Sequence, residues 1–149
     1  MAKRKQPTPF VLVDVNVLLD VLLAREPWSH DATMLLDLMA REQVRGAVAS
    51  HTVTTLHYLV ARTLDARAAN VAIADLLDIV EIVPPDAGDF RRALSLGLPD
   101  FEDAVQVVAH LKAGSSAIVT RNAKDFRRAR VETRLPGEVL AQLQQRGDS

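Results

Sequence analysis

The residue types best suited to chemistry in this sequence are carboxylates and amides that stand close to apolar runs. Asp14 directly follows the run Phe10–Val13, and Asn16 comes two residues later. Asp100 and Asp103 stand three residues apart, which places them on one face of a predicted helix. Oxygen ligands of this kind suit Mg²⁺ or Mn²⁺, and a divalent ion held by them supports reactions at a phosphate.

Each of these side chains also has a purely structural explanation. Asp and Asn are favoured at helix N-caps, so Asp14, Asn16 and Asp100 could serve only as caps. Asp103 would suit the positive end of a helix dipole, and Glu102 is expected to point towards solvent. The decision between chemistry and capping therefore depends on whether the fold brings the two clusters together.

Alternating strand-like and helix-like segments define the fold class. Short apolar runs predict strands at 10–13, 46–50, 79–83, 116–120 and 131–133. Apolar spacing and capping residues predict helices at 16–24, 29–42, 52–64, 66–77, 86–96 and 100–113, and a terminal helix from Pro136. We therefore expect a three-layer α/β/α fold with a central parallel sheet of about four to five strands. Residues 10–149 are expected to form this single domain, after a flexible tail at residues 1–9.

A parallel sheet would gather the candidate residues at one place. The carboxyl ends of its strands lie at the same edge, which is where open α/β sheets bind ligands. Thr120 and Asn122 stand at the end of the fourth predicted strand and would therefore approach Asp14. The helix that begins near Asp100 would bring its two aspartates to this edge if its preceding loop leads there.

Composition restricts the classes of protein that remain. The 149 residues carry a net charge of −1 and contain no cysteine. Disulfides, cysteine zinc sites and thiol catalysis are thereby excluded, and a strongly basic, non-specific nucleic-acid binder is not expected. No apolar stretch reaches membrane-spanning length, so we expect a cytoplasmic protein with no membrane partner. One stretch is basic enough to suit contacts to phosphate. Its basic residues are Arg121, Lys124, Arg127, Arg128, Arg130 and Arg134.

Four segments of the sequence resemble the motifs of the PIN-domain ribonucleases, a family that includes the VapC-type toxins of toxin–antitoxin pairs. They are Val11–Asp20, Val48–Ser50 with the threonine-rich stretch after it, Asp100–Ala104 and Val119–Phe126. The resemblance covers about residues 10–142. It implies a metal-dependent endoribonuclease that hydrolyses the RNA backbone in line and leaves a 5′-phosphate product.

The resemblance also implies roles for individual residues. Asp14 and Asp103 would be the principal ligands of Mg²⁺ or Mn²⁺, and Asp100 would be an auxiliary acid. Asn122 would stand where the family often has a fourth acid, and would complete the catalytic set. The residues implied to orient ligands or substrate are Asn16, Thr55, Thr120 and Arg121.

One departure from the family pattern concerns the helix after the second predicted strand. The family usually carries a Glu there, whereas this helix has no acid before Asp65. Thr55 would take the place of the missing Glu, with Leu56 as the neighbouring possibility. A hydroxyl can hold a water but brings no charge, so we expect weaker metal affinity than is usual for the family.

Four other side chains of types that often function are interpreted as structural. Trp28 and Tyr58 are expected to be packing residues, with stacking on a nucleic-acid base as the alternative. His51 and His57 are expected to be surface or partly satisfied side chains. A hydrogen bond to phosphate is the alternative for His57.

Three functions remain open from the sequence. The leading hypothesis is a Mg²⁺- or Mn²⁺-dependent endoribonuclease that acts as a toxin, with RNA, a cognate antitoxin protein and a second copy of the chain as partners. The alternative is a catalytically weak or inactive PIN module that binds RNA or a protein, because the usual Glu is missing. The third is an aspartyl-phosphate protein. Against it, Asn16 stands where the phosphatase pattern requires an Asp, and the receiver pattern requires an acidic pair that is absent.

Overall fold

Five parallel strands form the centre of the molecule, whose computed structural model describes residues 7–147. The sheet order is β3-β2-β1-β4-β5. The strands are β1 (Phe10–Val13), β2 (Arg45–Ala49), β3 (Val80–Val83), β4 (Ala117–Val119) and β5 (Thr133–Arg134). All four strand pairings are parallel. The predicted sheet is therefore confirmed, with its last strand displaced towards the C-terminus.

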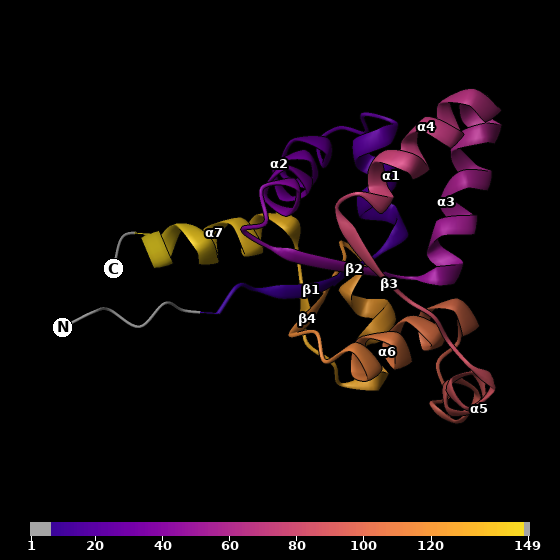
Figure 1. Ribbon diagram of the computed structural model, residues 1–149. Helices are drawn as coiled ribbons and strands as arrows, with labels where there is room; N and C mark the ends of the chain where they lie inside the picture. The colour runs from indigo at the N-terminus through magenta and orange to yellow at the C-terminus, as the bar shows by residue number, and fades with distance from the viewer. Residues whose placement is uncertain (1–6, 148–149) are drawn as a thin grey trace.

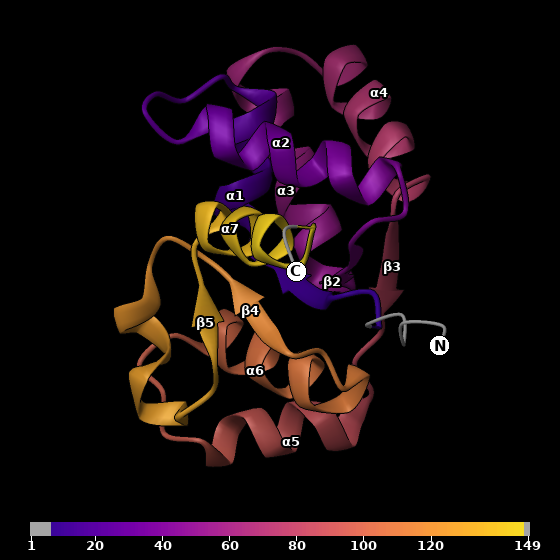
Figure 2. The same cartoon turned by 90° about the vertical axis from the view of Figure 1, so that its left-hand side faces the viewer.

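Helices cover both faces of this sheet, which confirms the predicted three layers. The helices are α1 (Val15–Leu22), α2 (Ser29–Ala40), α3 (Ser50–Thr63), α4 (Ala66–Leu77), α5 (Ala87–Ser95), α6 (Phe101–Ala113) and α7 (Pro136–Gly147). Figures 1 and 2 show α1 to α4 and α7 on one side of the sheet, and α5 and α6 on the other. The expected flexible tail falls mostly on residues 1–6, which lie outside the described part.

The central strands are apolar on both faces because each face is covered. Val11 and Val13 point to the side of α1 and α3, where they join the larger buried cluster. Leu12 and Ile118 point to the other side and pack with the second cluster, which includes Phe126. This alternation follows from the two-residue period of a strand. It places the strand ends, and the polar residues after them, at the rim of the core.

The segment after β4 differs from the prediction. Residues Ala123–Ala129 form a 3₁₀ helix, η1, which the sequence analysis did not anticipate. Phe126 is its single fully buried side chain and anchors it under the sheet. Because only one of its seven residues is buried, the sequence of this element shows no apolar periodicity that would predict a helix.

Capping residues explain where several helices begin. Asp65 accepts a hydrogen bond from the Ala68 amide at 2.7 Å, and Asp100 accepts one from the Asp103 amide at 2.9 Å. Ser29 does not cap α2: its hydroxyl donates to Glu26 at 2.6 Å. Capping is therefore one confirmed role of Asp100, and it fixes the orientation of the first turn of α6.

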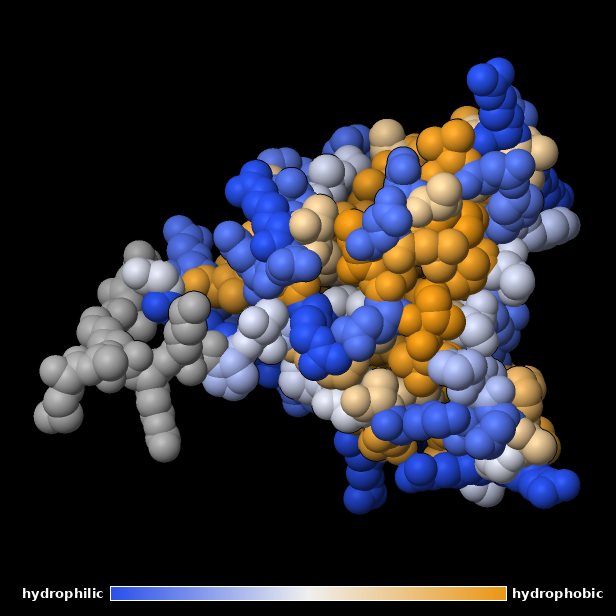
Figure 3. Space-filling view, in the orientation of Figure 1, coloured by the Kyte–Doolittle hydropathy of each residue, from blue (hydrophilic) through white to orange (hydrophobic). Residues whose placement is uncertain are grey.

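The surface carries an apolar band on one side. Figure 3 shows it over the region that α4 and β3 occupy in Figure 1. On these elements Val71, Leu77 and Ile82 are exposed. Within residues 7–147, no helix has the length and apolar character needed to cross a membrane.

Candidate active site

An acidic cleft of about 210 Å³ lies at the carboxyl edge of the sheet. Residues after β1, in the first turns of α3 and α6, and in η1 line it. They are Asp14, Val15, Asn16, His51, Thr52, Thr55, Asp100, Glu102, Asp103, Gln106 and Asp125. The two acidic clusters that stand far apart in the sequence thus meet in one cleft. The fold therefore gives the carboxylates a shared site in addition to their local capping.

Asp14 is the most firmly held carboxylate of the cleft. It is only 5% exposed. Its Oδ1 accepts a hydrogen bond from Gln106 Nε2, and its Oδ2 accepts one from the Thr120 hydroxyl, both at 3.0 Å. Its backbone amide donates to the Val119 carbonyl at 3.0 Å, which continues the pairing of β1 with β4. Each carboxylate oxygen keeps a further lone pair for a ligand.

Asp103 has the most strongly shifted pKa among the carboxylates of the cleft. Burial raises its pKa from 3.8 to about 7, and the negative charges of Asp100, Asp125, Asp14 and Glu102 add to this increase. Like charges this close disfavour one another's ionisation. A cation between them would remove that repulsion and return Asp103 to its ionised form.

The donor set fits a hydrated hard cation. All the charged groups are carboxylates, and oxygen ligands suit Mg²⁺ and Mn²⁺. Across residues 7–147, no group of three or more His, Cys, Asp or Glu side chains forms a ready-made cage. Mg²⁺ is nevertheless usually held by one or two carboxylates and keeps several waters. The gathering of five carboxylates in one cleft, with Asp103 partly buried among them, is the observation that favours a cation here.

The other predicted site residues divide into two groups. Asn16 and Thr55 line the cleft, and Thr120 reaches it through its hydrogen bond to Asp14. Asn122 does not line the cleft; its backbone amide donates to the Thr120 hydroxyl oxygen at 3.0 Å. Arg121 turns away altogether.

Arg121 belongs instead to a second pocket. It donates two hydrogen bonds to Asp20, at 2.9 and 3.3 Å. Its guanidinium lies 4.0 Å from the centre of the Trp28 ring. Two other residues of the predicted basic stretch are also engaged, since Arg134 donates to Gln142 at 2.6 Å and Arg128 contacts the Gly97 carbonyl at 3.4 Å. No lysine or arginine is among the residues that line the acidic cleft.

The two residues considered for the position of the family's Glu differ in their surroundings. Thr55 lines the cleft, whereas Leu56 is fully buried in the core. Helix α3 contributes His51, Thr52 and Thr55 to the cleft, and none of these carries a carboxylate. Thr55 therefore stays the predicted occupant of that position, and α3 adds no negative charge to the cleft.

Six residues of the cleft were not singled out from the sequence as site residues: Val15, His51, Thr52, Glu102, Gln106 and Asp125. Gln106 stands one turn after Asp103, a spacing that could have indicated it. Asp125 comes from η1, whose conformation was unforeseen. Glu102 is exposed, as expected, and it also borders the cleft. His51 has a buried Nδ1 without a hydrogen-bond partner, and burial lowers its pKa against the opposing charges of Glu102 and Asp100.

His57 agrees with its structural interpretation, since it does not line the cleft and its Nε2 lies 2.7 Å from Asn70 Oδ1 on α4. One further expectation is corrected. Tyr58 is 60% exposed, so it is not a packing residue. Trp28 is also partly exposed, and it packs against Arg121.

Comparison with known proteins places this arrangement in context. The family profile of the PIN domain matches residues 10–124. Ribonuclease VapC1 of Aquifex aeolicus (strain VF5) is 26% identical over 121 residues, which cover 78% of this chain and 83% of that protein.

Solved structures show the same fold. VapBC2 of Rickettsia felis, bound to a DNA fragment from its promoter, gives a TM-score of 0.67 at 15% identity, covering 85% of this chain and 98% of that chain. The sarcin-ricin loop cleaving toxin VapC20 of Mycobacterium tuberculosis gives a TM-score of 0.60 at 20% identity, covering 72% and 86%. At this identity the likeness concerns the fold alone.

Proposed function

The chain belongs to the PIN-domain family, and from that premise we propose that it is a metal-dependent endoribonuclease and the toxin of a toxin–antitoxin pair. The observation that carries this proposal is the fixed, buried carboxylate of Asp14 in a cleft with four other acids. Helix capping alone does not explain why these carboxylates gather in one cleft. Its relatives support the substrate class, since one is named a ribonuclease and a protein of the same fold is described as a sarcin-ricin loop cleaving toxin.

The residues of the cleft divide the work between them. Asp14 and Asp103 would hold Mg²⁺ or Mn²⁺, while Asp100 and Asp125 add negative potential around them. The ion, when bound, supplies a water of lowered pKa and neutralises charge on the phosphate oxygens. Gln106 orients Asp14 by donating a hydrogen bond to Oδ1. Hydrolysis would break the bond from phosphorus to the 3′-oxygen, leaving a 3′-hydroxyl and a 5′-phosphate.

Thr120 also positions Asp14 in this scheme. Its hydroxyl donates to Asp14 and its oxygen accepts the Asn122 amide, so the chain after β4 is tied to the metal-binding carboxylate. Asn16 and Thr55 face the same cleft and would orient the substrate or its water. Asn122 would act indirectly, by holding this turn. Such outer contacts fix ligand geometry, which a small ion with strict geometry requires.

The partners follow from the family and from the surface. An antitoxin protein is proposed because VapBC2 is a toxin–antitoxin complex of the same fold. A homodimer is proposed because exposed Val71, Leu77 and Ile82 lie on neighbouring elements, and exposed apolar groups of this kind are typical of interaction surfaces. Size-exclusion chromatography with light scattering checks the dimer directly.

The experiment that tests the proposed activity uses purified protein and a panel of structured and single-stranded RNAs. Each RNA is incubated with Mn²⁺, with Mg²⁺ and with chelator, using wild type, Asp14→Asn and Asp37→Asn. Asp37 pairs with Arg41 on the surface and serves as the matched control. We expect cleavage only with a divalent ion, its loss in Asp14→Asn and its retention in Asp37→Asn. Cleavage that persists in chelator or in Asp14→Asn contradicts the proposal.

A second function is favoured by one observation, the absence of any carboxylate from α3 in the cleft. With one acid fewer, the protein would be a PIN module that binds RNA or a protein without cleaving it. RNA binding by folded wild type, with no cleavage in any lane of the same panel, would support this alternative.

A further inference from the structure

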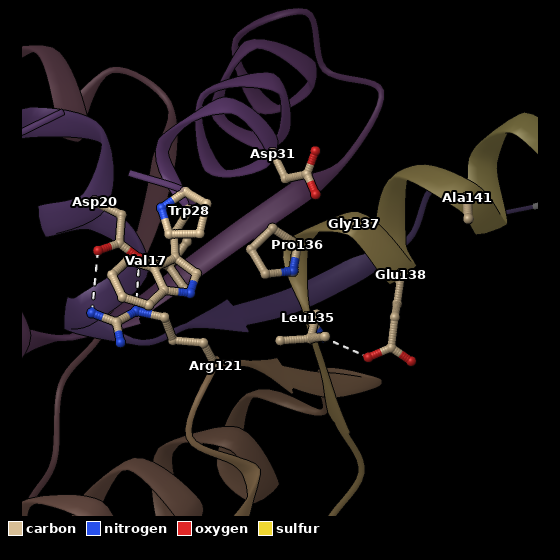
Figure 4. Close-up of a pocket in the computed structure, with 11 residues that line it drawn as sticks. Val17, Asp20, Trp28, Asp31, Arg121, Leu135, Pro136, Gly137, Glu138 and Ala141 are labelled. Atoms are coloured by element: carbon tan, nitrogen blue, oxygen red, sulfur yellow. Dashed lines mark hydrogen bonds and ion pairs between the residues drawn. The ribbon is translucent and has the colours of Figure 1, made fainter. Parts of the chain in front are cut away.

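A second pocket, of about 340 Å³, lies beside the acidic cleft and has mostly apolar walls. Figure 4 shows it between α1, α2 and the first turn of α7. Its walls include Val17, Trp28, Leu135 and Pro136. Trp28 is 44% exposed, so a large aromatic surface is open to a ligand. Such a concave, apolar site with a few polar groups is the usual form of a site for a small organic group.

The indole wall of this pocket is held in place by a charged pair. Asp20 is only 1% exposed and accepts two hydrogen bonds from Arg121. The Arg121 guanidinium in turn stacks on Trp28. A buried ion pair does not by itself indicate a gain in stability, because well-packed apolar residues of similar volume often stabilise a core equally well. In this pocket the ion pair fixes the orientation of Trp28, so the indole ring forms a preorganised wall.

The polar groups that the pocket offers are hydrogen-bond acceptors. Asp31 stands in the first turn of α2 and lines the pocket. A Cβ atom at residue 137 would lie only 2.7 Å from Asp31 Oδ2, so glycine there leaves room for the carboxylate. Glu138 uses Oε1 to accept the Leu135 amide at 2.9 Å, which leaves Oε2 for another donor.

The pocket and the cleft are joined through consecutive residues. Thr120 donates to Asp14 in the cleft, and Arg121 directly after it lines the pocket. Asn16 lines the cleft, and Val17 directly after it lines the pocket. A nucleotide next to the phosphate that is cleaved could therefore place its base in the pocket.

We propose that this pocket binds an unpaired guanine base of the RNA substrate, beside the phosphate held in the acidic cleft; this inference rests on the proposed function. The flat, apolar base stacks on the wall formed by Trp28. Its neighbouring N1–H and N2–H groups donate to the carboxylate of Asp31, because single-stranded bases are recognised by stacking and by their Watson–Crick edges. Uracil has one N–H between two carbonyl oxygens, which Asp31 would repel. The pocket thus selects the nucleotide next to the cut.

Trp28 provides a direct readout, because it is the only tryptophan of the chain. The experiment titrates metal-free protein in chelator with guanosine and with uridine while the fluorescence of Trp28 is recorded. N-acetyltryptophanamide corrects for light absorbed by the nucleosides. We expect saturable quenching by guanosine, with an affinity about tenfold higher than for uridine.

Three variants locate the binding. Asp31→Asn should weaken guanosine binding by about tenfold, because it removes the charge from the acceptor. Ala141→Phe places a ring at the exposed wall of the pocket and should abolish the quenching. Asp37→Asn, on the same helix but outside the pocket, should bind guanosine as wild type does.

Several results would overturn the guanine pocket. They are the absence of saturable quenching, equal affinities for the two nucleosides, or guanosine binding that Asp31→Asn leaves unchanged. Quenching by a Trp-Lys dipeptide amide but not by guanosine would assign the pocket to a protein partner instead. Because the assay needs no cleavage, RNA hydrolysis without guanosine binding contradicts the pocket alone. Guanosine binding without hydrolysis upholds the pocket and contradicts the nuclease.

Discussion

Gln106 Nε2 donates a hydrogen bond to Asp14 Oδ1 at 3.0 Å, across a sequence separation of 92 residues. The other side-chain atom of this amide, Oε1, is buried without a hydrogen-bond partner. An unsatisfied buried acceptor costs free energy of folding. Gln106 therefore orients the carboxylate that we propose holds the metal ion, at a cost to the stability of the fold.

The first prediction concerns this residue. Gln106→Leu should weaken Mn²⁺ binding or RNA cleavage by about 10- to 100-fold, because Asp14 loses its orienting donor. The free energy of unfolding in chelator should change by less than about 1 kcal/mol, because removal of the unpaired Oε1 acceptor offsets the loss of the donor to Asp14 Oδ1. Calorimetric Mn²⁺ titration and urea denaturation measure the two effects. The exposed Gln144→Leu is the control, and a loss of stability equal to the loss of binding would contradict the assignment.

The second prediction follows from the raised pKa of Asp103. Since the folded protein holds this proton more tightly than the unfolded chain, its stability in chelator should fall as pH rises from about 4 to about 7, and stay level above that. The side chain is partly exposed, so the fall is about 1–2 kcal/mol. Asp103→Asn should remove this component. Urea denaturation at pH 4.5 and pH 8 compares the two proteins; an equal pH dependence in both would contradict the shift.

The third prediction separates the cap from the charge at Asp100. Asp100→Asn keeps an acceptor for the Asp103 amide, whereas Asp100→Ala removes it. Asp100→Ala should therefore destabilise the protein by about 1 kcal/mol more than Asp100→Asn does. Both variants should lower the pKa of Asp103, because both remove a neighbouring negative charge. Thermal unfolding and NMR titration of the carboxyl group measure these effects, and an unchanged pKa would show that Asp100 does not act on Asp103.

The fourth prediction restores the missing acid. Thr55→Glu should tighten Mn²⁺ binding by about tenfold, because a further carboxylate would face the cleft. In chelator the same variant should be less stable, since it adds to the repulsion around Asp103. Leu56→Glu is the contrasting variant: that side chain is fully buried, so the protein should unfold. Unchanged Mn²⁺ affinity in folded Thr55→Glu would mean that residue 55 does not face the ion.

Much of the fold was predictable because local signals agreed with the tertiary structure. The run Phe10–Val13 has the composition of a buried strand, and the caps at Asp65 and Asp100 mark helix starts. The approach of Thr120 to Asp14 followed from the rule that parallel strands share one carboxyl edge, whereas Asp103 was expected there only if the loop before its helix led to that edge. These inferences needed only periodicity and topology.

The rest depended on contacts between distant residues, which spacing does not encode. Arg121 belongs to the basic stretch that was expected to meet phosphate, yet it donates two hydrogen bonds to the buried carboxylate of Asp20 and lines the second pocket instead. Asp125 entered the cleft through a 3₁₀ helix that has one buried residue. Side-chain direction at such points is decided by partners elsewhere in the chain.

The central claim is that the cleft around Asp14 is a metal-dependent ribonuclease centre. The most direct measurement is the initial rate of cleavage of one RNA in Mn²⁺ by wild type, Asp14→Asn and Asp37→Asn, with the new 5′ ends tested by a 5′-phosphate-dependent exonuclease. We predict 5′-phosphate ends from wild type and Asp37→Asn, and a rate lower by at least about 100-fold for Asp14→Asn. Equal rates in wild type and Asp14→Asn, or products without a 5′-phosphate, would contradict the claim.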